Sequence, residues 1–319
     1  MSQSPLHETA PRRVEITEVG PRDGLQSEAV FIPTERKIDL VRALIAAGAR
    51  SFEITSFVSP RAVPQLRDAE EVLAAFRERD GVHMSALVPN ARGAERAVRA
   101  GVDAMVLFAS ASESHNRKNV NASRAESLAG FAEVVRIAEA GGVAAQGAIA
   151  TAFGCPFEGA VPVADVVEMA RGYRDLGVTR VTLGDTTGMA TPPLVAERCR
   201  ALRAAIPDID IALHFHNTRG VGLVCAWVGL QEGVTRYESS IGGLGGCPFV
   251  PRATGNVCTE DLAYMLAESG VETGLDLAGL IAAAQLAERI VGRELPGQVM
   301  KAGPRLQTAP MDSARTARG

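Results

Sequence analysis

A short pattern of hydrophobic and polar positions recurs along the chain. It consists of an amphipathic helical pattern, a glycine, and then a short apolar run rich in β-formers, as in "LIAAGARSFEITSF", "AVRAGVDAMVLFAS" and "YRDLGVTRVTLGD". A helix end favours a residue that tolerates positive φ, and the glycines fall at such ends. They are Gly48, Gly101, Gly142, Gly177 and Gly233. The apolar runs are typical of buried parallel strands, so the pattern predicts a chain of repeated helix–strand units.

The pattern places eight strands, at 14–20, 51–57, 83–88, 103–109, 144–151, 179–184, 210–216 and 236–241. Helical patterns lie between them, among others at 34–47, 67–79, 123–140, 162–176 and 193–205, and two more follow the last strand, at 259–269 and 276–291. Eight such units predict an α/β fold, a (β/α)8 TIM barrel with extra C-terminal helices. An open doubly wound sheet is the alternative, but "GPRDGLQ" after the first strand is not its GxGxxG fingerprint. We expect one domain over 1–303 and a flexible tail over 304–319.

Composition and charge exclude several classes of partner. The 319 residues are 46% hydrophobic and 22% charged, with a net charge of −4. Because no basic cluster and no apolar run of about 18 residues occurs, we expect neither a nucleic-acid nor a membrane partner. The first residues lack the apolar core of a secretory signal. The five cysteines are odd in number and include no CxxC pair, which predicts a reducing, cytoplasmic setting without structural zinc or disulfides.

Polar residues gather where the predicted strands end, which is where TIM barrels carry their chemistry. In chain order these residues are Arg22, Asp23, Gln26, Glu28, Glu53, Ser56, Asp185, His214, His216, Cys247, Arg252 and Asn256.

The stretch "LHFHNTRG" predicts a metal site. Residues i and i+2 of a strand share a face, so His214 and His216 point together into the barrel mouth. In a closed barrel, strands seven and one flank strand eight, which places Asp23 and the loop of Asn256 on the same arc. A carboxylate, two imidazoles and an amide oxygen suit Mg²⁺ or Mn²⁺ better than a closed zinc site. Two different interpretations stay open: hydrogen-bonded core histidines, and a metallohydrolase, which lacks further ligands here apart from Asp185.

Two neighbouring segments add candidate catalytic groups. Arg22 lies between a proline and the candidate ligand Asp23, which favours a role as partner of an oxyanion or carboxylate. The segment "GGLGGCP" has four glycines in five residues. Since neither a Lys-Ser/Thr pair nor a helix follows, it predicts a mobile lid rather than a phosphate cradle. The lid would bring Cys247 to the rim, where a thiol with a pKa of about 8.5 can exchange a proton near neutrality.

Six motifs together resemble the 3-hydroxy-3-methylglutaryl-CoA lyase family. They are "EVGPRDGLQSE", "TSFVSP", "SASESHNRKNVN", "FGCPFEG", "LGDTTG" and "GGLGGCPFVPRATGNVCTEDLAYML", spread over about residues 14 to 300. The resemblance implies an acyl-CoA substrate, a homodimer, and a divalent cation held by Asp23, His214, His216 and Asn256. It also implies Arg22 as the catalytic arginine, Glu53 as a second acid near the site, and Cys247 as a lid residue used in proton transfer.

The implied reaction is a metal-assisted retro-Claisen cleavage of a 3-hydroxyacyl-CoA to acetyl-CoA and a keto acid. Cys247 or a histidine such as His214 would protonate the carbanion, and Gln26 and Arg219 are further candidates for substrate binding. Family members commonly read His-x-His-Asp-Thr-Tyr-Gly where this chain has Asn217 and Arg219. The departure leaves open a different substrate, such as citramalyl-CoA. The sequence also leaves open a Claisen-condensing synthase of the isopropylmalate or citramalate type, and a metal-binding barrel without catalysis.

Overall fold

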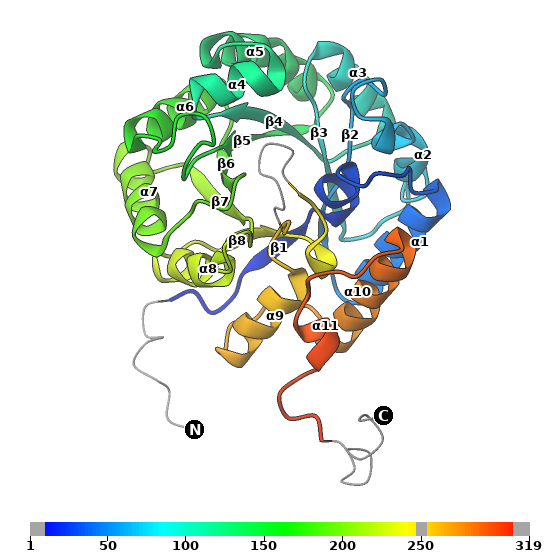
Figure 1. The fold of residues 1–319 in the computed structure, drawn as a ribbon. Helices are drawn as coiled ribbons and strands as arrows, with labels where there is room; N and C mark the ends of the chain where they lie inside the picture. Colours follow the sequence, from blue (N-terminus) through cyan, green and yellow to red (C-terminus); the bar gives the residue numbers. More distant parts are fainter. Residues whose placement is uncertain (1–9, 247–253, 309–319) are drawn as a thin grey trace.

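The computed structural model describes residues 10–246 and 254–308. Within these ranges eight parallel strands close into a barrel in chain order, β1 beside β8 (Figure 1). They are β1 (Glu15–Glu18), β2 (Ser51–Ser56), β3 (His83–Leu87), β4 (Ala104–Ser110), β5 (Ala144–Ala150), β6 (Arg180–Asp185), β7 (Asp210–Phe215) and β8 (Arg236–Ser239). The predicted TIM barrel is confirmed, and each predicted strand overlaps an observed one.

The helices form a ring outside the strands (Figure 1). They are α1 (Thr34–Ala46), α2 (Ala69–Ala74), α3 (Ala91–Ala100), α4 (Glu113–Val120), α5 (Arg124–Ala140), α6 (Val163–Asp175), α7 (Pro192–Ala205) and α8 (Gly222–Gln231), followed by α9 (Thr259–Glu268), α10 (Leu277–Val291) and α11 (Val299–Ala302). Helix α2 is shorter than the predicted 67–79, because a 3-10 turn, η3 (Pro64–Leu66), precedes it and turns follow it. Helix α10 packs against α1 on the outside of the barrel.

The hydrophobic core lies between the strands and the helices. Outward-facing strand residues such as Phe52, Met84, Leu107 and Leu213 are fully buried against the helical ring. The inward-facing positions are mostly polar, whereas TIM barrels usually fill them with branched apolar side chains. The apolar core of this barrel therefore lies on one face of each strand, and the inward face, which is also buried, carries mostly polar groups available for chemistry.

No helix within the described ranges has the length and apolar character required to cross a membrane. Residues 304–308 of the predicted tail are exposed and form neither helix nor strand. Residues 309–319, the predicted lid residue Cys247 and the predicted strand-end residue Arg252 lie outside the described ranges.

Candidate active site

A single-turn π-helix, η2 (Gly20–Gly24), places the first two site residues. The sequence pattern extends the first strand to residue 20, but β1 ends at Glu18 and the chain turns immediately. The backbone N–H of Asp23 donates to the carbonyl of Val19, and Pro21 occupies the first turn of η2. Such π-turns are frequent at functional sites. Here the turn directs Arg22 and Asp23 toward the barrel mouth.

Asp23, His214 and His216 form a group that could hold a metal ion. One ligand atom from each lies within 4.8 Å of the others, and the two imidazole centroids are 5.2 Å apart. Phe215, between the histidines, points outward and packs against Phe153 at 5.6 Å. The alternation predicted for β7 is therefore confirmed.

Asn256 joins this group from the loop that follows β8. It forms an isolated bridge with His216, and its Nδ2 donates to Asp23 Oδ2 at 2.7 Å and to the carbonyl of Leu244 at 2.9 Å. The residues at the ends of β1, β7 and β8 thus meet on one arc of the rim, as predicted.

Arg22 connects the metal-ligand group to Glu53 on β2. Its Nη1 donates to Asp23 Oδ1 and its Nη2 donates to Glu53 Oε2, both at 2.7 Å. Arg22 is 8% exposed and Glu53 is 3% exposed, so both charges are withdrawn from water. A buried guanidinium with two carboxylate partners has a fixed orientation, which suits a group that must meet a developing negative charge.

Several polar atoms in this cluster are buried without a hydrogen-bond partner in the described structure. They are Arg22 Nε, Glu53 Oε1, His216 Nδ1 and Asn256 Oδ1. Buried polar atoms are normally satisfied, so a concentration of orphan donors and acceptors at one place indicates a site built for a ligand. Together with the carboxylate and imidazole donors, the free amide oxygen of Asn256 fits a divalent cation that prefers oxygen and nitrogen ligands.

The electrostatics keep the group ready for a cation. Burial alone would raise the pKa of Asp23, but Arg22 and the two histidines hold it at about 2, so the carboxylate stays ionised. Burial, with His214 nearby, lowers the pKa of His216 to about 4, so this imidazole is neutral at physiological pH. Burial would also lower the pKa of His214, but the hydrogen bond to Glu238 raises it. Metal ligands must be deprotonated, and Asp23 and His216 meet that requirement.

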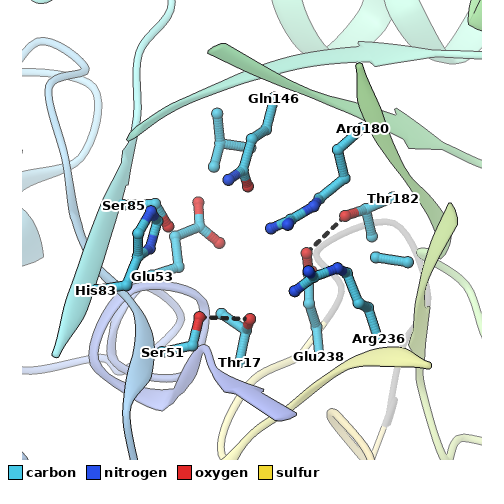
Figure 2. Close-up of a pocket in the computed structure, with 12 residues that line it drawn as sticks. Thr17, Ser51, Glu53, His83, Ser85, Gln146, Arg180, Thr182, Arg236 and Glu238 are labelled. Carbon is cyan, nitrogen blue, oxygen red and sulfur yellow. Dashed lines mark hydrogen bonds between the residues drawn. The ribbon is translucent and has the colours of Figure 1, made fainter. Parts of the chain in front are cut away.

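Glu238 on β8 is a site residue that the sequence reasoning missed as a candidate. Its Oε2 accepts from His214 Nδ1 at 3.0 Å and its Oε1 accepts from Thr182 Oγ1 at 2.7 Å. Figure 2 shows Glu238 and Glu53 directed into a polar chamber inside the barrel, into which Arg180 and Gln146 also point. The chamber has a free volume of about 10 Å³, close to the space of one water molecule. A charged residue inside a short buried strand was the signal available in "RYESS".

Other predicted strand-end residues do not join the cluster. Asp185 accepts backbone N–H groups of Met189 and Ala190, which makes it the cap of its own loop, and burial raises its pKa to about 7. Glu28 pairs with Arg293 near the C-terminal helices at 2.5 Å. Gln26 follows η2 and is half-buried.

Arg219, the second candidate for substrate binding, pairs with neither of the carboxylates Asp185 and Glu238. Its Nη1 donates to the backbone carbonyls of Thr187 and Gly188.

Comparison with known proteins agrees with this geometry. The HMGL-like family model matches residues 13–287. The hydroxymethylglutaryl-CoA lyase YngG of Bacillus subtilis is 43% identical over 288 residues, covering 90% of this chain and 96% of the relative. The (R)-citramalyl-CoA lyase of Chloroflexus aurantiacus is 42% identical over 301 residues, covering 91% and 95%. The structure of an HMG-CoA lyase from Acinetobacter baumannii, in complex with coenzyme A and 3-methylmalate, superposes with a TM-score of 0.89 at 41% identity, covering 94% and 98%. The chain therefore belongs to the HMGL-like family, the family of the hydroxymethylglutaryl-CoA lyases.

Proposed function

We propose that this carbon–carbon lyase cleaves 3-hydroxy-3-methylglutaryl-CoA, or a closely related 3-hydroxyacyl-CoA, to acetyl-CoA and a keto acid. One observation carries the proposal: the partly buried Asp23 and the buried His214 and His216 have ligand atoms within 4.8 Å of one another, directly beside a guanidinium held by two carboxylates. The group of Asp23, His214 and His216 suits Mg²⁺ or Mn²⁺, with Asn256 as a further ligand. When bound, the cation would lower the pKa of the substrate hydroxyl and orient the acyl group.

Each chain residue then has a defined task. Glu53, whose Oε1 has no partner in the described structure, would take the proton of the substrate hydroxyl. The bond between the two reacting carbons then breaks, and its electron pair becomes the enolate of acetyl-CoA. Arg22, fixed by Asp23 and Glu53, would neutralise the enolate oxygen. Glu53, whose pKa is raised by burial despite its contact with Arg22, is the second acid beside the reacting atoms. The carbanion would take a proton from Cys247; His214, the other predicted donor, has its Nδ1 on Glu238 and its Nε2 on the cation when it acts as a ligand.

The direct test is an assay with 3-hydroxy-3-methylglutaryl-CoA and Mg²⁺. We expect acetyl-CoA and acetoacetate to form in equal amounts, EDTA to abolish the reaction, and Mg²⁺ or Mn²⁺ to restore it. Full activity in excess EDTA, with no bound metal by elemental analysis, would contradict the proposal.

A second candidate substrate is citramalyl-CoA. The citramalyl-CoA lyase of Chloroflexus aurantiacus is 42% identical to this chain, and the rat mitochondrial hydroxymethylglutaryl-CoA lyase is also 42% identical, so identity does not separate the two substrates. After its histidine pair this chain has Asn217 and Arg219, at the positions where family members commonly read Asp and Tyr. Measuring kcat/KM for both esters decides between them: a preference for citramalyl-CoA of tenfold or more identifies it as the substrate.

We further propose that the protein is a homodimer in the cytoplasm, and that it binds neither nucleic acid nor membranes. The four described cysteines are free and buried, which is compatible with a reducing compartment. Light scattering coupled to gel filtration measures the mass, and a monomer of 33.5 kDa would contradict the dimer.

A further inference from the structure

Glu238 is the register partner of His214 in the adjacent strand. The pairing of β7 with β8 places His214 directly beside Glu238, and both side chains face the barrel interior. Glu238 itself is not in the group of possible metal ligands formed by Asp23, His214 and His216. Glu238 contacts that group by its hydrogen bond to the His214 ring.

Both carboxylate oxygens of Glu238 have one donor each in the described structure. His214 Nδ1 donates to Oε2 at 3.0 Å, and Thr182 Oγ1 donates to Oε1 at 2.7 Å (Figure 2). The two arginines that line the chamber, Arg180 and Arg236, are instead paired with Asp210, at 3.0 and 2.6 Å. The carboxylate is therefore oriented by a hydroxyl and is free to orient the imidazole.

The hydrogen bond determines which nitrogen of His214 can bind a cation. An ionised carboxylate can only accept, so Nδ1 carries a proton, and in the neutral imidazole Nε2 therefore presents its lone pair. His216 differs, because its buried Nδ1 has no partner in the described structure. One histidine of the pair is thus held by a carboxylate and the other is not.

We propose that Glu238 is a positioning residue, which with Thr182 holds the His214 ring in the orientation and tautomer that bind the divalent cation. The inference rests on the proposed function, because it assumes a cation at Asp23, His214 and His216. Carboxylates behind metal-binding histidines commonly contribute 10- to 100-fold to metal affinity. The same range is expected here.

The test measures Mn²⁺ affinity by titration calorimetry on the full-length protein, without substrate. Glu238→Leu fills the same space but accepts no hydrogen bond, and Mn²⁺ binding should weaken at least tenfold. Glu238→Gln can still accept from His214, since the Thr182 hydroxyl can rotate to accept from the amide, and it should recover most of that loss. Thr17→Val is the matched control, because Thr17 lines the same chamber and bonds only to Ser51 in the described structure. Its Mn²⁺ affinity should stay within twofold of wild type.

A second measurement follows the tautomer directly. The chain has five histidines, so ring nitrogen NMR spectra can be assigned with single His→Gln variants. In the metal-free wild type, His214 should carry its proton on Nδ1, whereas Glu238→Leu should give a mixture of tautomers.

If the leucine variant does not fold, Thr182→Val replaces it in both measurements, with a smaller expected change in the same direction. The wild-type tautomer and affinity in both Glu238→Leu and Thr182→Val, or equal losses in Glu238→Leu and Glu238→Gln, would overturn the inference. A wild type that binds no Mn²⁺ would instead overturn the proposed function.

Discussion

Arg22 is held by two carboxylates, so its substitution tests whether it serves chemistry or only structure. Its Nη1 and Nη2 are taken by Asp23 and Glu53, while Nε is buried without a partner in the described structure. If Arg22 meets a charge that forms only in the transition state, Arg22→Gln should lower kcat by about 10²-fold or more with little change in KM. Steady-state kinetics, with melting curves as the control for folding, provide the measurement. A variant within threefold of wild type would show that Arg22 is structural.

Cysteine reactivity tests the predicted lid role of Cys247. Cys155, Cys199, Cys225 and Cys258 are all buried and free, and burial raises the pKa of Cys199 to about 11 and that of Cys225 to about 12. Buried thiols of this kind are poor nucleophiles. We expect iodoacetamide to modify Cys247 first, with loss of activity and with protection by substrate. Mass spectrometry that finds one of the four buried cysteines alkylated first, or a fully active Cys247→Ser, would count against the lid role.

At the scale of elements, strand alternation predicts much of the site. Period-two alternation places His214 and His216 on one face, and barrel closure brings Asp23 and Asn256 to them. The sequence could not show η2, because a single π-turn has no period of its own. Nor could it show Glu238: its role depends on the lateral register of β8 against β7, which tertiary packing sets.

The loop after β8 approaches Asn256 and Asp23 so closely that a glycine is required at one position. Gly245 has φ +125°, and a Cβ there would lie 2.5 Å from Asn256 Nδ2 and 3.5 Å from Asp23 Oδ2. Gly245→Ala should therefore displace Asn256 from Asp23 and weaken Mn²⁺ binding by about tenfold, the scale of a lost supporting contact. Gly142→Ala is the control, with φ +67° and no neighbouring atom within 4 Å of its Cβ. Calorimetry that finds equal affinity in both variants would contradict the prediction.

Arg219 links the loop after β7 to the loop after β6. Its Nη1 donates to the carbonyls of Thr187 at 3.0 Å and Gly188 at 2.7 Å, which fixes an exposed guanidinium at the rim. If this group also binds the acyl carboxylate, Arg219→Tyr should shift the ratio of kcat/KM for 3-hydroxy-3-methylglutaryl-CoA and citramalyl-CoA by roughly tenfold, or about 1.4 kcal/mol. An unchanged ratio, with both rates falling together, would leave Arg219 only the task of joining the two loops.

At the scale of the whole molecule, the repeated helix–strand pattern is sufficient to predict the barrel, whereas it does not predict the polar interior. Apolar runs are typical of strands buried on both faces, yet Ser51, Ser85 and Thr182 point inward. Single polar residues in short strands are a weak signal when the strands are only four to seven residues long. The polar interior continues into a cavity of about 830 Å³ at the N-terminal end of the barrel, and His83 and Arg180 line both spaces.

Two further carboxyl groups join the end of the barrel to the C-terminal helices. Glu18 accepts from the backbone N–H of Gly20 and of Ile241, and from Thr259 Oγ1. Glu260 Oε2 accepts from the backbone N–H of Gly242, and its Oε1 has no partner in the described structure. Burial raises the pKa of Glu18 to about 7 and that of Glu260 to about 8, from an ordinary value of 4.5.

These raised pKa values predict how the stability of the whole molecule depends on pH. Below pH 4.5 Glu260 is protonated in both the folded and the unfolded state, and its contribution to stability is fully present. Between pH 4.5 and about 8 the folded state keeps a proton that the unfolded state has lost, so the free energy of unfolding falls as pH rises through this window.

Glu260→Gln is neutral at every pH, and it should reduce that fall by an amount on the order of a few kcal/mol. Part of the fall should persist, because Glu18 titrates in the same window. Urea unfolding at pH 5.5 and 8.5 in EDTA measures the change, with the exposed Glu133→Gln as control. A fall in Glu260→Gln as large as that of wild type would mean that Glu260 is already ionised in the folded protein, and that the buried end of the barrel tolerates the charge.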